Sequence, residues 1–112
     1  MAKKGEYLVV FITSASPEEA RQIAEALVSN RKAACVNVVP AVQSRFWWRG
    51  RIESANEALL IVKTKSSLLD DLIALVKQNH SYEVPEIIAL PIVGGSRDYL
   101  NWLDEETSKE SA

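Results

Sequence analysis

The sequence is short of several features that would quickly narrow its function. Among its 112 residues there is one cysteine, Cys35, and one histidine, His80, so one chain can form neither a disulfide nor a Cys/His-rich structural zinc site. Thirteen basic and fifteen acidic residues give a net charge of −2, without the basic excess of a general nucleic-acid binder. No apolar run approaches the ~20 residues that a membrane span needs. These absences favour a small globular protein in a reducing compartment.

The composition predicts one folded domain. Hydrophobic residues make up 47% and charged residues 25%, and a chain of this length can bury a core without disulfides or a structural metal. The apolar run from Tyr7 to Ile12 is too short for a signal-peptide core, and no small-residue cleavage site follows it. We therefore expect a single cytoplasmic domain over residues 1–112, with a polar, frayed tail over residues 104–112.

The first half of the chain alternates strand-like and helix-like segments. The run from Tyr7 to Ile12 predicts a buried strand. Ser16, Pro17 and Glu19 are typical of a helix start, and the helix should end near Asn30. Residues 35–48 and 51–64 then read as the two arms of a long hairpin, with a bend or bulge at a proline, residue 40.

The second half completes a recognisable order of elements. A second helix should run from about Ser66 to His80, and residues 87–90 predict a fourth strand. Ser96 can cap a short last helix. The order predicts an α+β fold, a ferredoxin-like βαββαβ subunit with an extra C-terminal helix.

The hairpin is too long for a domain of this size. Each arm of about 15 residues would extend roughly 50 Å, against a diameter of about 34 Å for a compact domain. Phe46 and Trp48 share one face and Trp47 points the other way, so aromatic surface would be exposed in a monomer. A neighbouring subunit could cover it, or it could stack on single-stranded nucleic acid with the help of nearby arginines. The acidic overall charge favours the subunit contact.

Residues 80–86 gather the only histidine, a tyrosine and two carboxylates directly after a predicted helix. His80 could be a metal ligand or a proton-transfer group, joined by Glu83 or Glu86. The plainer interpretation is a helix-ending turn, in which the helix dipole favours a histidine. Spacing alone favours the plainer interpretation.

Cys35 presents a similar choice. A thiolate there would suit copper or zinc, whereas a lone cysteine among apolar neighbours is more often a core residue. A symmetric trimer would supply three cysteines and three histidines. The sequence has no nucleophile elbow and no metalloprotease motif, so an enzyme hypothesis depends on His80 and the nearby carboxylates.

Several segments taken together resemble the CutA family, the proteins of divalent-cation tolerance. The segments are Ala34-Cys35-Val36-Asn37, the alternating residues Ser44, Phe46, Trp48, Gly50 and Ile52, then Glu57 with Lys63-Thr64, the string from His80 to Ile87, and Tyr99-Leu100 with Trp102-Leu103. The resemblance covers the chain from about Tyr7 to Leu103. Two positions depart from the family pattern: Ser81 stands where proline is usual, and Phe46 where tyrosine is frequent.

The resemblance implies a tight homotrimer, similar to the PII signalling proteins, with a link to copper and other divalent metals and no established reaction. We therefore expect a non-enzymatic homotrimer without an obligatory cofactor and without nucleic-acid or membrane partners, which binds Cu(II) or another divalent cation weakly. The candidate metal ligands are His80, Cys35, Glu83 and Glu86.

The main alternative is a PII-like signalling module that binds a small ligand in clefts between subunits. The candidate cleft residues combine aromatic surface with a few polar groups, as ligand sites do, and are Trp48, Lys63, His80, Tyr82, Glu83 and Trp102. A weaker alternative is an enzyme that uses His80 as an acid or base.

Overall fold

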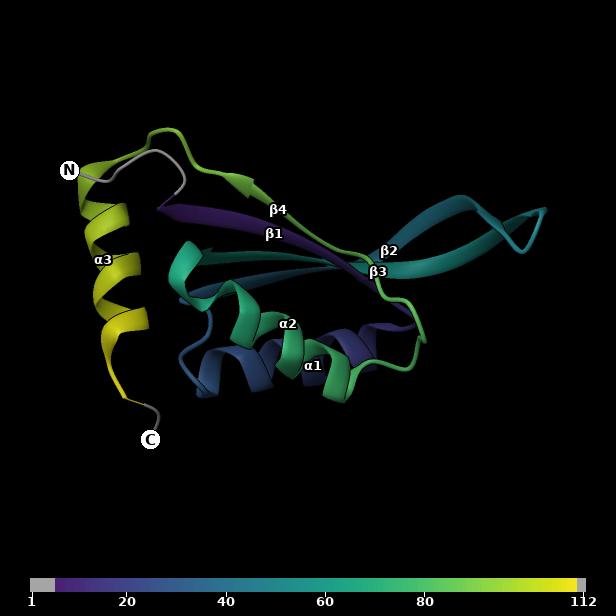
Figure 1. Cartoon of the computed structure of the whole chain (residues 1–112), viewed down its shortest axis with the longest axis horizontal. Coiled ribbons are helices and arrows are strands. Elements are labelled where there is room, and N and C mark those ends of the chain that lie inside the picture. Colours follow the sequence, from purple (N-terminus) through teal and green to yellow (C-terminus); the bar gives the residue numbers. More distant parts are fainter. Residues whose placement is uncertain (1–5, 111–112) are drawn as a thin grey trace.

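The computed structural model describes residues 6–110 and shows a four-stranded antiparallel sheet with two helices against one face and a third across the end of the sheet (Figure 1). The strands are β1 (Tyr7–Ser14), β2 (Cys35–Trp48), β3 (Arg51–Lys65) and β4 (Ile87–Pro91), and their order in the sheet is β2-β3-β1-β4. The helices are α1 (Pro17–Ser29), a 3-10 turn over Ser66–Leu68, α2 (Leu69–Asn79) and α3 (Arg97–Ser108). The structure thus confirms an α+β fold with the succession of elements that the sequence predicts. No helix within residues 6–110 is long and apolar enough to cross a membrane.

The core lies between the sheet and the pair of helices α1 and α2. It forms there because alternate residues of β1 and β3 point to the same face, while residues three and four apart face inward from each helix. The largest side chains that are fully buried on this side are Val10, Ile12, Ile23, Leu27, Leu60, Val62, Leu72 and Val76.

The opposite face of the sheet is left open by α1 and α2. Phe11 lies between Ile61 of β3 and Ile88 of β4 in the strand register, so these apolar residues form a row on that face. Leu90, paired with Val9, belongs to the next row. Ile88 and Leu90 are 52% and 45% exposed. One chain therefore leaves apolar sheet surface in contact with water.

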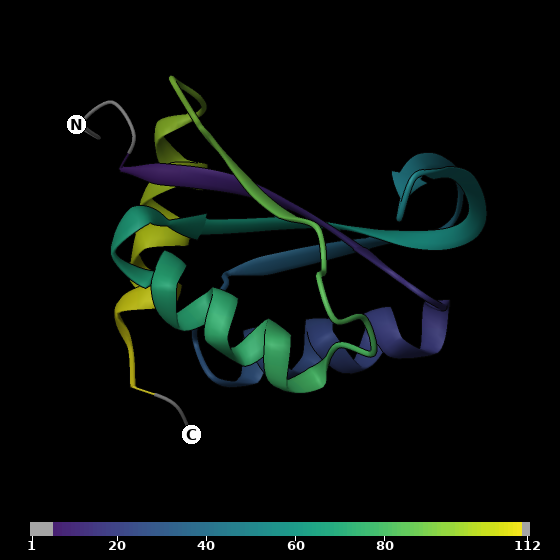
Figure 2. The ribbon, with the colours of Figure 1, turned by 45° about the vertical axis from the view of Figure 1, so that its right-hand side comes forward.

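The hairpin of β2 and β3 extends well beyond the rest of the sheet and curls at its far end (Figures 1 and 2). The strand register shifts between Val39 and Val42, on either side of Pro40, which confirms the predicted bulge. The molecule measures 46 Å along its longest axis. Trp47 near the tip is 72% exposed.

The last helix is longer than predicted. Residues 104–108, expected to be a frayed tail, belong to α3, and Thr107 within it is buried. The prediction was wrong because polar residues here form ion pairs with other elements: Asp104 with Lys65 of β3 at 3.3 Å, and Glu106 with Arg31 after α1 at 2.8 Å. Of the predicted tail, residues 111–112 lie outside the described residues.

Candidate functional site

An open pocket of about 930 Å³ lies between the outer part of the hairpin and residues 81–86, which connect α2 to β4. Its lining combines aromatic rings with carboxylates: Thr13, Gln43, Ser44, Arg45, Phe46, Trp48, Glu53, Ser54, Glu57, Ser81, Tyr82, Glu83, Val84, Pro85 and Glu86.

The hairpin supplies one wall through strand alternation. Phe46 of β2 lies opposite Glu53 of β3, and Val42 lies opposite Glu57, so their side chains share one face of the ladder. Trp48, two residues beyond Phe46, belongs to the same face. This wall therefore presents rings and carboxylates together.

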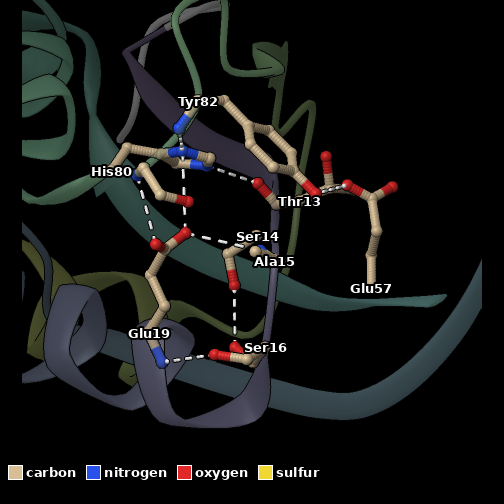
Figure 3. A network of polar contacts seen from close by, with 9 residues as sticks. Thr13, Ser14, Ala15, Ser16, Glu19, Glu57, His80 and Tyr82 are labelled. Carbon is tan, nitrogen blue, oxygen red and sulfur yellow. Dashed lines mark hydrogen bonds and ion pairs between the residues drawn. The ribbon is translucent and has the colours of Figure 1, made fainter. Parts of the chain in front are cut away.

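His80 holds the opposite wall in place from behind. Its ring is fully buried and lies between two backbone groups (Figure 3). Nε2 donates to the Thr13 carbonyl at 2.7 Å, and Nδ1 accepts the N–H of Tyr82 at 3.0 Å. A carbonyl can only accept and an N–H can only donate, so these contacts require the imidazole tautomer with its proton on Nε2. Both ring nitrogens are engaged, and neither is available to a metal ion in this arrangement.

Glu19, in the first turn of α1, fixes the same segment from the other side. One carboxylate oxygen accepts the N–H of Ser81 at 3.1 Å, and the other accepts the N–H of Ala15 at 3.3 Å (Figure 3). The oxygen that binds Ala15 also lies 3.6 Å from Nδ1 of His80. The contact with Ser81 needs a backbone N–H, which a proline at this position would lack.

Tyr82 links this buried network to the pocket. Its hydroxyl donates to Oε2 of Glu57 at 2.9 Å, and its ring lies 4.9 Å from that of His80. Burial, then the hydrogen bond to Glu57 and the charges of Glu57 and Glu19, raise the pKa of Tyr82 to about 12. Glu57 is only 6% exposed. Within residues 6–110 its Oε1 contacts no donor, and Glu57 lines the pocket.

The cleft was predicted between subunits, and within one chain the structure brings some of its residues together. Trp48, Tyr82 and Glu83 line the pocket, and His80 lies directly behind Tyr82. The other two residues are elsewhere. Lys63 lies opposite Cys35 in the ladder and contacts Asn37. Trp102 contacts Tyr99 of α3, with ring centroids 5.5 Å apart and the two rings tilted by 44°.

The predicted metal ligands do not form one site within the chain. Glu83 and Glu86 line the pocket, whereas Cys35 is at the start of β2, with its Sγ 3.9 Å from Oδ1 of Asn37. His80 is engaged as described. Over residues 6–110, no group of three or more histidine, cysteine, aspartate or glutamate side chains is placed to hold a metal ion.

Sequence reasoning did not single out Glu53 or Glu19, and it used Glu57 only as part of the resemblance. Glu57 carried a usable signal, because it is an acidic residue directly before the apolar run Ala58–Val62 of a predicted strand. Glu19 was explained fully by its predicted role at the helix start, where its N–H does bind Ser16 Oγ at 3.1 Å. Its second role requires residues about 60 positions away.

Comparisons with known proteins agree with the resemblance in the sequence. Residues 8–106 match the family model described as CutA1 divalent ion tolerance protein. Protein CutA 1, chloroplastic, from rice (Oryza sativa subsp. japonica) is 48% identical over 100 residues, covering 89% of this chain and 56% of the relative. Divalent-cation tolerance protein CutA from Thermus thermophilus is 52% identical over 99 residues, covering 88% of this chain and 96% of the relative. The chain thus spans little more than half of the plant relative and nearly all of the bacterial one.

Solved structures show the same similarity in three dimensions. The divalent cation tolerance protein Cut A1 from Thermus thermophilus superposes with a TM-score of 0.88 at 50% identity, covering 89% of this chain and 97% of that one. CutA1 from the psychrotrophic bacterium Shewanella sp. SIB1 gives a TM-score of 0.91 at 36% identity, covering 96% and 100%.

Proposed function

Since the chain belongs to the CutA1 divalent ion tolerance family, we propose that it serves divalent metal ion tolerance as a PII-like homotrimer that binds divalent cations weakly, Cu(II) among them. The family's name refers to tolerance and to no reaction, and the proposed role is not enzymatic. A cytoplasmic location stays a prediction, because relatives are named both chloroplastic and periplasmic. The proposal includes no nucleic-acid and no membrane partner.

The observation that carries the metal proposal is the set of carboxylates in one pocket. Glu53, Glu57, Glu83 and Glu86 all line it. Carboxylates bind divalent cations, and Cu(II) binds most tightly among the first-row ions to a given set of oxygen and nitrogen ligands. Because the described residues of one chain hold no complete metal-binding group, the binding should be weak.

Assembly is supported by surfaces that one chain leaves uncovered. Apolar residues of the open sheet face are exposed, as is Trp47 of the hairpin, which lies outside the pocket lining, and β2 and β4 are edge strands. A second copy would cover the same kinds of surface on each subunit, and a closed ring would leave no free edge. In a trimer, Cys35 and Lys63, which belong to the open face, would lie near a neighbour.

The metal proposal is tested by titrating Cu(II) into protein freed of metal with a chelator and then dialysed. We expect the double variant Glu83→Gln/Glu86→Gln to bind Cu(II) about tenfold more weakly or worse by isothermal titration calorimetry. Glu105→Gln, which removes an exposed carboxylate of α3 outside the pocket, is the matched control and should bind as the wild type does. Unchanged Cu(II) affinity in the double variant would contradict the proposal. If only Cys35→Ser lowers the affinity, the Cys35 thiol and not the carboxylates binds the metal.

A second candidate function, PII-like signalling through a small ligand, is favoured by the shape of the pocket. A volume of about 930 Å³, an aromatic wall and a few polar groups are typical of a small-molecule site. Such a ligand would raise the thermal stability of the protein by mass action.

A further inference from the structure

We propose that the pocket binds a small organic cation, an amine or a guanidinium carried on an apolar body. The inference rests on the second candidate function above and names its class of ligand. Three features of the pocket carry it: the charges of its lining, a carboxylate with one accessible oxygen, and a cation that already occupies its rim.

The lining is strongly acidic. Among the described residues that line the pocket, Glu53, Glu57, Glu83 and Glu86 face a single cation, Arg45. Arg45 lies opposite Ser54, so its side chain belongs to the face of the ladder away from Phe46 and Glu53. A phosphate, a nucleotide or a dicarboxylate would meet repulsion here, whereas a cation would be attracted.

Glu57 supplies a carboxylate with one oxygen bound to Tyr82 and the other left accessible. It is 6% exposed, and only its Oε2 receives a donor, the hydroxyl of Tyr82. No side-chain oxygen that is buried within residues 6–110 lacks a hydrogen-bond partner, so Oε1 of Glu57 remains accessible to solvent. A ligand that brings an N–H group and a positive charge to Oε1 would form a charge-assisted hydrogen bond with it.

The chain itself shows how a cation is held at the rim. The guanidinium carbon of Arg49 lies 5.4 Å from the centroid of the Trp48 ring, and an Nη lies 4.0 Å from Glu83. Trp48 and Glu83 both line the pocket. An aromatic face beside a carboxylate is the pairing that recognises organic cations, because the ring quadrupole and the negative charge act together. Phe46 and Tyr82 continue this aromatic surface inside the pocket.

Agmatine is a suitable probe, because it carries a guanidinium and an amine on an aliphatic chain. We expect saturable binding of agmatine by calorimetry in the presence of EDTA, and no binding of butanediol, its uncharged analogue, or of inorganic phosphate. Trp48→Leu and Glu53→Gln should each weaken agmatine binding about fivefold or more. Trp102→Leu is the matched control: this tryptophan and Trp48 are both 40% exposed, but Trp102 is on α3 and outside the pocket.

The outcomes separate this inference from the metal proposal. Metal is chelated in the agmatine titration, and Trp48→Leu should leave Cu(II) binding unchanged because the ring offers no metal ligand. Cu(II) binding without agmatine binding would overturn the inference alone, and agmatine binding without Cu(II) binding would uphold it while the metal proposal fails. Phosphate binding, or equal agmatine affinity in the Trp48 and Trp102 variants, would also overturn it. If Trp48→Leu does not fold, the agmatine affinity of Glu53→Gln tests the inference instead, and an unchanged affinity would overturn it.

Discussion

Tyr82 is the residue at which the buried network and the pocket meet, and its raised pKa gives a test of that position. The folded state favours the neutral phenol, with a pKa of about 12 against the ordinary tyrosine value of 10.0. Stability from this contact is therefore fully present below pH ~10 and is lost as the pH rises through about 12. We expect wild-type protein to lose about 1–2 kcal/mol more than Tyr82→Phe over this range, a value that allows for the partial exposure of the ring.

Urea unfolding at a series of alkaline pH values measures this difference. Absorbance of the phenolate should also show that Tyr82→Phe removes the tyrosine that titrates last. Tyr99→Phe is the control, because the pKa of Tyr99 is raised as well, by burial and by Cys35, and that variant should keep the late component. Identical profiles of stability against alkaline pH for wild type and Tyr82→Phe would show that the hydrogen bond from Tyr82 to Glu57 does not stabilise the fold.

His80 shows where residue-scale prediction succeeds and where it ends. The sequence left two interpretations open, and the structure places His80 at the C-cap of α2, as the plainer one predicts. The hydrogen bond from His80 to the Thr13 carbonyl could not be predicted from local spacing, because Thr13 is 67 positions away in the sequence. Contacts of this kind depend on how β1, α1 and the segment after α2 pack together, which local spacing does not encode.

The turn of the hairpin offers a test at the scale of the element. Arg49 and Gly50 have φ values of 51° and 79°, so both central residues of this tight turn are left-handed. A Cβ at Gly50 would meet no atom within 4 Å, and the cost of Gly50→Ala is therefore conformational, about 1 kcal/mol of unfolding free energy.

Gly94→Ala is a matched control for this measurement by urea unfolding. A Cβ at Gly94 also meets no atom within 4 Å, but its φ is not positive. It should be neutral, or stabilising by up to about 1 kcal/mol, because alanine restricts the unfolded chain. Equal effects of the two substitutions would indicate that the turn imposes no left-handed conformation.

The sequence predicted the helices and strands better than it predicted the contacts between them. Periodicity located every strand and helix, and Pro40 located the bulge, because these depend on local patterns. The end of α3 was missed because ion pairs of Asp104 and Glu106 with distant residues support its last turn. The pocket was predicted in part, since Trp48, Tyr82 and Glu83 belong to it. Lys63 and Trp102 lie outside the pocket of one chain, and the cleft between subunits to which the sequence assigned them stays a prediction.

At the scale of the whole molecule, the open sheet face bears on whether the protein is a monomer or an assembly of several chains. Its apolar rows cross three strands, from Ile61 through Phe11 to Ile88, and Leu90 belongs to the row beside them. Covering such a face would stabilise the protein, because each exposed apolar side chain would gain the free energy of burial. The proposed trimer predicts that a charge placed here will prevent assembly.

We expect Leu90→Glu to shift the protein from trimer to monomer, as read by native mass spectrometry and sedimentation, because a carboxylate buried without a partner at an interface is costly. Val28→Glu is the matched control: Val28 of α1 is 41% exposed and Leu90 is 45% exposed, but Val28 lies on the helical side of the sheet. The control should assemble as the wild type does. A monomeric wild type would refute the trimer itself, and a Leu90→Glu trimer would place the subunit contact on another surface. The hairpin, with Trp47 72% exposed near its tip, would then be the surface to test next.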